Sequence, residues 1–244
     1  MAAPPISDLI KQIKIGELLL PEFQRGYVWT ADQVKRYVLS LYRQYPTGHF
    51  LIWKTYKPQQ SRGSTNPPET SFSRLILDGQ QRLTSIYTLF EGKPPAFYEG
   101  ETLYFNLHFN LLEEDFQFYQ KAKMSDNPLW IAVTPFLQKG INQFLAELDK
   151  LPSEVRDIYL KHLAKFNKLD SIRTYTYHLD EVADKPVQEI VQIFNFVNSG
   201  GTKLSEADLA LARICVKWGE ARGKPSALPS NTLLRLALIL SWSC

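Results

Sequence analysis

The segment LILDGQQRLTSIYTLF, at residues 75–90, constrains the fold more than any other part of the sequence. Its first three residues are apolar and typical of a buried strand, and Asp78-Gly79 then gives a turn signal. The residues that follow repeat at helical spacing and share one apolar face: Leu83, Ile86, Tyr87 and Phe90. A strand that turns directly into an amphipathic helix needs a sheet with a helix packed on it. The segment therefore predicts a fold that mixes strands and helices.

Two elements before this segment have clear local signals. Thr30, with Gln33 three residues later, predicts a capping box at the start of a helix over residues 31–45. That helix is expected to stop at Pro46-Thr47-Gly48, and residues 49–53 are expected to form a short apolar strand. Both elements agree with a sheet that carries helices on it.

Beyond them, residues 57–74 contain almost nothing that could pack, so we expect an exposed loop there. Residues 103–109 alternate strictly between apolar and polar side chains. Together with Phe116 and Phe118, across an intervening turn, this alternation predicts a hairpin.

The pattern becomes helical from about residue 136. Ser153 is expected to cap a helix that turns Val155, Ile158, Leu163 and Phe166 inward, and residues 187–198 are expected to form another. Only residues 173–179 look extended in this half. We therefore predict an α+β N-terminal half and a mainly helical C-terminal half.

Composition excludes several classes of protein. With 244 residues and 44% hydrophobic residues the chain can bury an ordinary core, and its two cysteines, Cys215 and Cys244, cannot form a disulfide framework. No basic start followed by an apolar signal core is visible, and the longest apolar stretch is too short to cross a bilayer. We expect a cytoplasmic protein without a membrane partner. Residues 1–100 carry 12 basic and 8 acidic side chains, an excess compatible with an anionic ligand.

The Asp-Gly-Gln-Gln-Arg run is the most specific candidate site. The first turn of a helix presents free backbone N–H groups and the positive end of its dipole, and Gly79 allows close approach of a ligand. Arg82 is expected to be exposed, so its replacement is expected to leave the fold intact, and it adds charge for an anion. Asp78, at the strand end, is placed to hold Mg²⁺ or to orient water. The alternative is that Asp78 is a helix N-cap and Arg82 a surface residue.

Two other segments are weaker candidates. In LPEFQRGYVW, Gln24 and Arg25 lie between apolar residues, which suits a bidentate phosphate contact, although an ion pair with a carboxylate is the simpler interpretation. FNFVNSGGTKLSEADLALARI, residues 194–214, has three interpretations. It is a helix-turn-helix that reads DNA, a turn that brings Asn198 and Thr202 to a ligand, or a plain helical hairpin. The four histidines have no spacing typical of metal ligands.

These segments together resemble a known family. PEFQRGYVW, GHFLIW, ILDGQQRLTSIYTLF and FNFVNSGGTKLSEADLALARI are similar, in this order, to signatures of the GmrSD-type restriction endonuclease N-terminal domain. That family is placed in the ParB/sulfiredoxin-like superfamily. The resemblance implies a ParB/sulfiredoxin-like nucleotide-binding unit over residues 1–135 and a helical region over residues 136–244.

The resemblance also implies which residues form the site. The catalytic residues would be Asp78, Gln80, Gln81 and Arg82, with Asp78 also the metal ligand. The nucleotide-binding residues would be Gln24, Arg25, Gly79, Asn198 and Thr202. Arg25 and Arg82 would neutralise phosphate charge, and Gln80 or Gln81 would position the nucleophile.

The expected function is a Mg²⁺-dependent nucleoside triphosphatase domain of a bacterial system that restricts modified phage DNA. Many relatives carry a second, HNH-like nuclease domain, so we expect no nuclease activity from this chain alone. It would be a truncated fragment, a standalone regulatory subunit, or one half of a two-chain enzyme with a separate nuclease subunit. The alternative function is a DNA-binding adaptor without catalysis, and salt-dependent DNA affinity without nucleotide turnover would favour it.

Overall fold

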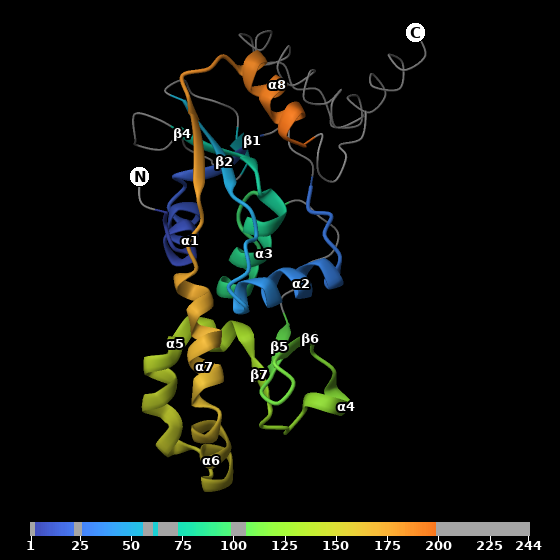
Figure 1. The fold of residues 1–244 in the computed structure, drawn as a ribbon, viewed down its shortest axis with the longest axis vertical. Helices are drawn as coiled ribbons and strands as arrows, with labels where there is room; N and C mark the ends of the chain where they lie inside the picture. Colours follow the sequence, from blue (N-terminus) through green and yellow to red (C-terminus); the bar gives the residue numbers. More distant parts are fainter. Residues whose placement is uncertain (1–2, 22–25, 56–60, 63–72, 99–105, 199–244) are drawn as a thin grey trace.

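A computed structural model of the chain describes residues 3–21, 26–55, 61–62, 73–98 and 106–198 (Figure 1). In chain order the elements are α1 (Ile6–Lys14), β1 (Leu18–Pro21), α2 (Ala31–Tyr42), β2 (Phe50–Thr55), β3 (Ser61–Arg62), β4 (Ser73–Asp78), α3 (Gln80–Glu91), β5 (Leu107–Asn110), β6 (Asp115–Phe118), α4 (Lys121–Met124), β7 (Trp130–Ala132), α5 (Val133–Glu147), η1 (Leu148–Lys150), α6 (Ser153–Lys161), α7 (Leu163–Asp170), η2 (Ser171–Thr174), β8 (Leu179–Ala183) and α8 (Val187–Asn198). This mixture of helices and sheets confirms the predicted α+β class.

The main sheet contains five strands in the order β3-β1-β4-β2-β8. Its central strand β4 pairs in parallel with β1 and antiparallel with β2, where Ile76 lies opposite Ile52. The edge strand β8 pairs in parallel with β2, so that Phe50 lies opposite Leu179. Strand β8 therefore joins the sheet built by the first half of the chain, although it lies in the region that the sequence predicts to be mainly helical.

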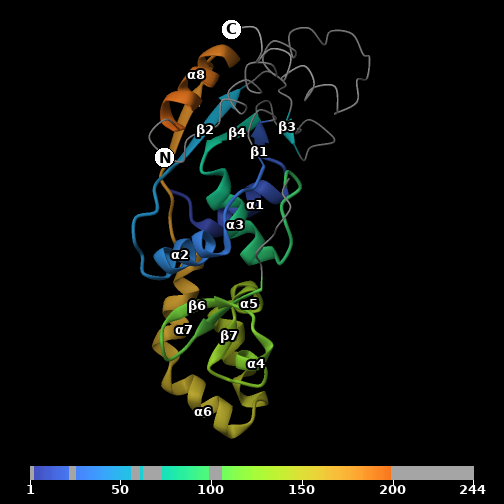
Figure 2. The ribbon, with the colours of Figure 1, turned by 90° about the vertical axis from the view of Figure 1, so that its right-hand side faces the viewer.

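The two faces of the main sheet contact different helices. Since successive side chains of a strand point to opposite faces, Leu18 and Ile76 pack with α1, α2 and α3. Leu19 and Leu75 point to the other face and pack with Ile190, Val191 and Phe194 of α8. Figure 2 shows α8 on the side of the sheet away from α1 and α3. Both faces of β4 are buried, as its continuous apolar run predicts.

A smaller antiparallel sheet, in the order β6-β5-β7, lies with α5, α6 and α7 at the end of the molecule opposite α8 (Figures 1 and 2). The predicted hairpin is the β5–β6 pair, in which Phe109 lies opposite Phe116. Both rings are buried and lie within 6 Å of the Tyr42 ring of α2. The apolar core is therefore continuous from α2 into the smaller sheet.

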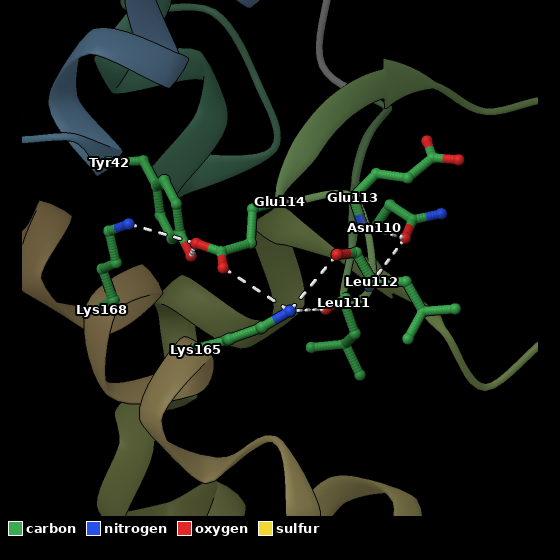
Figure 3. A network of polar contacts seen from close by, with 8 residues as sticks. All are labelled: Tyr42, Asn110, Leu111, Leu112, Glu113, Glu114, Lys165 and Lys168. Atoms are coloured by element: carbon green, nitrogen blue, oxygen red, sulfur yellow. Dashed lines mark hydrogen bonds and ion pairs between the residues drawn. The ribbon is translucent and has the colours of Figure 1, made fainter.

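A polar network also joins these parts (Figure 3). The Glu114 carboxylate, in the turn between β5 and β6, accepts a hydrogen bond of 2.6 Å from the Tyr42 hydroxyl. It also pairs with Lys165 and Lys168 of α7, at 3.5 and 3.1 Å. The Lys165 ammonium in addition donates to the main-chain oxygen of Leu111, at 2.6 Å. One carboxylate thus links α2, the hairpin and α7.

Most local predictions are confirmed, with exceptions in both halves. Residues 57–74, expected to form an exposed loop, include β3 and the first two residues of β4, and the rest lie outside the described residues. Thr30 and Gln33 form the predicted capping box. Ser153, however, is the first helical residue rather than the cap, because Pro152 takes the N-cap position. The expected helix from Ser153 to Phe166 is divided at His162 into α6 and α7, and Phe166 is buried while α6 has no fully buried residue. The segment expected to be extended, residues 173–179, begins with the last two residues of a 3-10 turn over Ser171–Thr174.

Candidate functional site

The candidate site begins where β4 passes into α3. Gly79 is the N-cap of α3 and has a positive φ of 96°, a conformation that glycine adopts at little cost. A Cβ at this position would lie 2.1 Å from Cδ1 of Phe50, so the close approach of β2 also requires glycine. Helix α3 begins immediately, and the Leu83 N–H donates to the Gly79 carbonyl at 2.9 Å. The first backbone N–H groups of any helix have no partner within it, so this turn presents donors.

Arg82 extends from the first turn of α3 toward the loop before β2. Its Nη1 donates to the Thr47 carbonyl at 2.6 Å, and its Nη2 donates to the His49 carbonyl at 2.9 Å. The guanidinium also lies 5.2 Å from the centre of the Phe50 ring. A Cβ on Gly48 would lie 2.5 Å from Nη1 and would displace the guanidinium, and the φ of 87° at Gly48 also favours glycine. The Arg82 side chain is only 15% exposed, so the prediction that it is exposed is wrong.

Asp78 lies at the C-terminal end of β4 and pairs with Arg82, with 2.9 Å between Oδ2 and Nη2. It is not the N-cap of α3, because Gly79 occupies that position and no side chain caps the helix there. Both parts of the simpler interpretation, an N-cap aspartate and a surface arginine, are therefore wrong. The Asp78 side chain is 31% exposed, so the ion pair remains in contact with solvent.

The described residues do not by themselves provide a complete set of side-chain ligands for a magnesium ion. The carboxylate of Asp78 is already paired with a cation, and a second positive charge beside Arg82 is unfavourable. No group of three histidine, cysteine, aspartate or glutamate residues within the described ranges could hold a metal ion. Asp78 as a metal ligand stays a prediction.

Gln81 points away from the turn and contacts the first candidate segment. Its Oε1 accepts hydrogen bonds from the N–H groups of Val28, at 2.8 Å, and Trp29, at 3.3 Å. Its Nε2 donates to the Gly26 carbonyl at 3.1 Å. One turn further along α3, the Ser85 hydroxyl lies 2.7 Å from that of Tyr27. The structure thus brings the first and second sequence motifs together.

The other predicted site residues are placed less completely. Gln80 is the first residue of α3 and is half-buried. Asn198 is the last residue of α8, which lies on the opposite face of the main sheet from α3. Gln24, Arg25 and Thr202 lie outside the described residues, as do residues 199–214 of the third motif.

Sequence reasoning did not identify a group of hydroxyls around Thr47. Thr47 Oγ1 donates to the Tyr177 hydroxyl at 2.8 Å and lies 3.1 Å from that of Tyr175. The Tyr37 hydroxyl is hydrogen-bonded to that of Tyr177. Burial raises the pKa of Tyr177 to about 12 and that of Tyr37 well above its usual range, so both stay protonated near neutral pH. Thr47-Gly48 was interpreted only as a helix stop, so no sequence signal pointed to these hydroxyls.

The loop before β2, which contains Thr47 and His49, also contacts the edge strand β8. The Asp180 carboxylate lies 3.3 Å from Nε2 of His49 and 3.1 Å from Nε2 of His178. His49 therefore contacts β8 through its side chain and Arg82 through its carbonyl. The geometry can support chemistry on an anion: a helix N-terminus, a partly exposed aspartate–arginine pair and a loop that fixes the arginine.

Comparison with known proteins agrees with this arrangement. A family model described as "GmrSD restriction endonuclease, N-terminal domain" matches residues 6–215. The chain belongs to this family. The matched range contains the β4–α3 turn, the segment that Gln81 holds, and the loop that binds Arg82. The GmrSD N-terminal domain family gives the chain the context of a DNA restriction and phage-defence system.

The chain is also similar to an uncharacterized protein of Methanocaldococcus jannaschii. It is 29% identical over 260 residues, an alignment that covers 88% of this chain and 43% of the relative. The chain therefore spans less than half of that relative's length. Within the described residues of this GmrSD N-terminal domain, no helix is long and apolar enough to cross a membrane.

Proposed function

We propose that this GmrSD N-terminal domain binds and hydrolyses a nucleoside triphosphate within a system that restricts modified DNA. The observation that carries the proposal is the β4–α3 turn with Arg82 beside it. A triphosphate is the ligand class that such a turn suits, because a helix N-terminus and a guanidinium both favour phosphate oxygens. The family membership supports the restriction context.

Arg82 keeps capacity for a ligand despite its internal contacts. A guanidinium has five N–H groups, and the hydrogen bonds to Thr47, His49 and Asp78 use three of them. Within the described part of the chain, no hydrogen bond engages the other two. The internal contacts fix the plane of the group in advance, which lowers the entropy cost of binding phosphate.

In this proposal each residue of the site has a separate role. Arg82 and the first-turn N–H groups of α3 bind phosphate oxygens, and Arg25 adds a second cation. Asp78 keeps Arg82 in place and accepts a proton from an attacking water, while Gln80 orients that water. Mg²⁺ enters with the triphosphate as its counterion. Modified phage DNA and an HNH-type nuclease subunit or domain are the proposed partners of the wider system.

The direct test is thermal unfolding of the purified chain with each of the four nucleoside triphosphates, with and without Mg²⁺. A ligand at one hundred times its dissociation constant stabilises the native state by about 2.7 kcal/mol. For a chain of this size that corresponds to a rise in Tm of roughly 5–10 °C. Release of inorganic phosphate, measured in parallel, separates binding from hydrolysis.

A matched pair of arginine variants makes the test specific. Arg82→Lys keeps the charge but loses the planar donor set, and we expect nucleotide affinity to fall about tenfold or more. Arg43→Ala removes an exposed arginine just beyond α2 and should leave affinity unchanged. If no triphosphate raises Tm but DNA binds with a steep salt dependence, the non-catalytic DNA-binding adaptor is the better assignment.

A further inference from the structure

The side-chain amide of Gln81 is almost fully used by contacts within the protein. Gln81 is 9% exposed, although it lies in the first turn of α3 beside the candidate site. Its Oε1 accepts from the N–H groups of Val28 and Trp29, and its Nε2 donates to the Gly26 carbonyl. An amide oxygen has two lone pairs, and here both are engaged. This oxygen therefore cannot accept a hydrogen bond from an attacking water.

A second contact from the next turn of α3 supports the same segment. The Ser85 hydroxyl donates to the Gln81 carbonyl at 2.8 Å, which uses its single hydrogen. The Tyr27 hydroxyl, 2.7 Å from Ser85 Oγ, is then the donor of that buried hydrogen bond. Gln81 and Ser85 thus bind the same short stretch: Gln81 binds the main chain at Gly26, Val28 and Trp29, and Ser85 binds the side chain of Tyr27.

We propose that Gln81 is a positioning residue that holds Gly26–Trp29 against α3, so that the first and second sequence motifs move as one unit. The proposal rests on the proposed nucleotide site and assigns Gln81 a role there that acts through other residues. The held stretch directly follows Gln24 and Arg25 in the sequence, and it leads into the capping box of α2. A loss of these contacts releases the first motif while the β4–α3 turn stays in place.

Amide hydrogen exchange measured by NMR tests the contact without any nucleotide. Gln81→Met keeps the length and helix propensity of the side chain and removes all three hydrogen bonds. We expect the Val28 and Trp29 amides to exchange about tenfold faster or more, with the amides of β4 unchanged. Gln81→Glu retains the acceptor for both N–H groups, so its exchange rates should lie between those of wild type and those of Gln81→Met. Ser85→Ala leaves the Gln81 contacts intact and removes only the hydrogen bond to Tyr27, so both amides should exchange more slowly than in Gln81→Met.

Nucleotide affinity of the same variants tests the positioning role. Affinity should fall about tenfold in Gln81→Met and less in both Gln81→Glu and Ser85→Ala. Unchanged exchange at Val28 and Trp29 in Gln81→Met would overturn the inference, as would faster exchange with wild-type affinity. If the wild-type chain binds no triphosphate, the proposed function fails on its own, and the exchange rates still decide whether Gln81 holds the segment.

Discussion

Arg82 shows how one side chain can serve both the fold and a ligand. Its guanidinium touches two main-chain carbonyls, one carboxylate and the face of one aromatic ring. A side chain that bound only phosphate would not need these contacts. Through these contacts Arg82 also contributes to the stability of the fold, a role that the sequence alone did not indicate.

We expect Arg82→Ala to lower the free energy of unfolding by about 2 kcal/mol, because two carbonyls and Asp78 lose a charged donor. It should also abolish nucleotide binding. Urea denaturation followed by circular dichroism measures the first effect. A variant as stable as wild type would show that the contacts to Thr47 and His49 contribute nothing.

Substitution of Gly79 tests the close contact between the β4–α3 turn and Phe50. Gly79→Ala must place a methyl group 2.1 Å from Phe50 at a φ of 96°, whereas Gly16→Ala at a φ of 75° meets nothing within 4 Å. Both variants carry the strain of a left-handed alanine, and Gly79→Ala carries overpacking as well. We expect Gly79→Ala to be about 2 kcal/mol less stable than Gly16→Ala in urea. Equal losses would mean that β2 shifts freely to accept the methyl group.

Elements are joined by the network around Glu114, and its electrostatics predict a pH effect. The hydrogen bond from Tyr42 lowers the pKa of Glu114 below its usual value, and the hydrogen bond and charge of Lys168 and the charge of Lys165 lower it further. A carboxylate with a lowered pKa in the folded state stabilises the fold above the pKa of the unfolded chain. That stabilisation is lost as the pH falls through the folded pKa. The network thus favours neutral over acidic conditions.

We therefore expect Glu114→Gln to be less stable than wild type at pH 7 and to approach wild type as the pH falls toward 3. The loss is smaller than for a buried pair, because the side chain is 35% exposed. Glu113→Gln is the matched control, since its carboxylate points away from the network in Figure 3. Urea midpoints over this pH range provide the measurement, and parallel curves for Glu114→Gln and wild type would contradict the assignment.

Sequence patterns predicted the helices and strands better than the contacts that these elements make. The capping box at Thr30, the helix after Gly79 and the β5–β6 hairpin follow from spacing within a few residues. The division of α6 from α7 depends on what packs beneath them, which local spacing does not contain. The partners of Arg82 and Gln81 are mainly main-chain atoms, and any residue type can supply those. The β4–α3 turn was therefore predictable, while the contacts that hold its side chains were not.

For the whole molecule, the continuous core predicts cooperative unfolding. One apolar cluster contains Ile76 of the main sheet and Phe166 of α7, at the far end of the described chain. Phe166→Ala should cost about 3–5 kcal/mol, because it leaves a cavity among aromatic rings. Within each protein, wild type or variant, we expect β4 and α7 to unfold at one shared urea concentration. NMR signals from each element measure this midpoint. Separate midpoints would show that the two ends are independent units.

The parallel pairing of β2 with β8 has a consequence for synthesis of the protein. A ribosome completes β2 early, but its partner β8 follows only after everything from β3 to η2 has been made. During that interval β2 forms an open edge, and an open strand edge can pair with another chain. Nascent chains on one messenger RNA are close neighbours, so this edge is where two of them would associate before release.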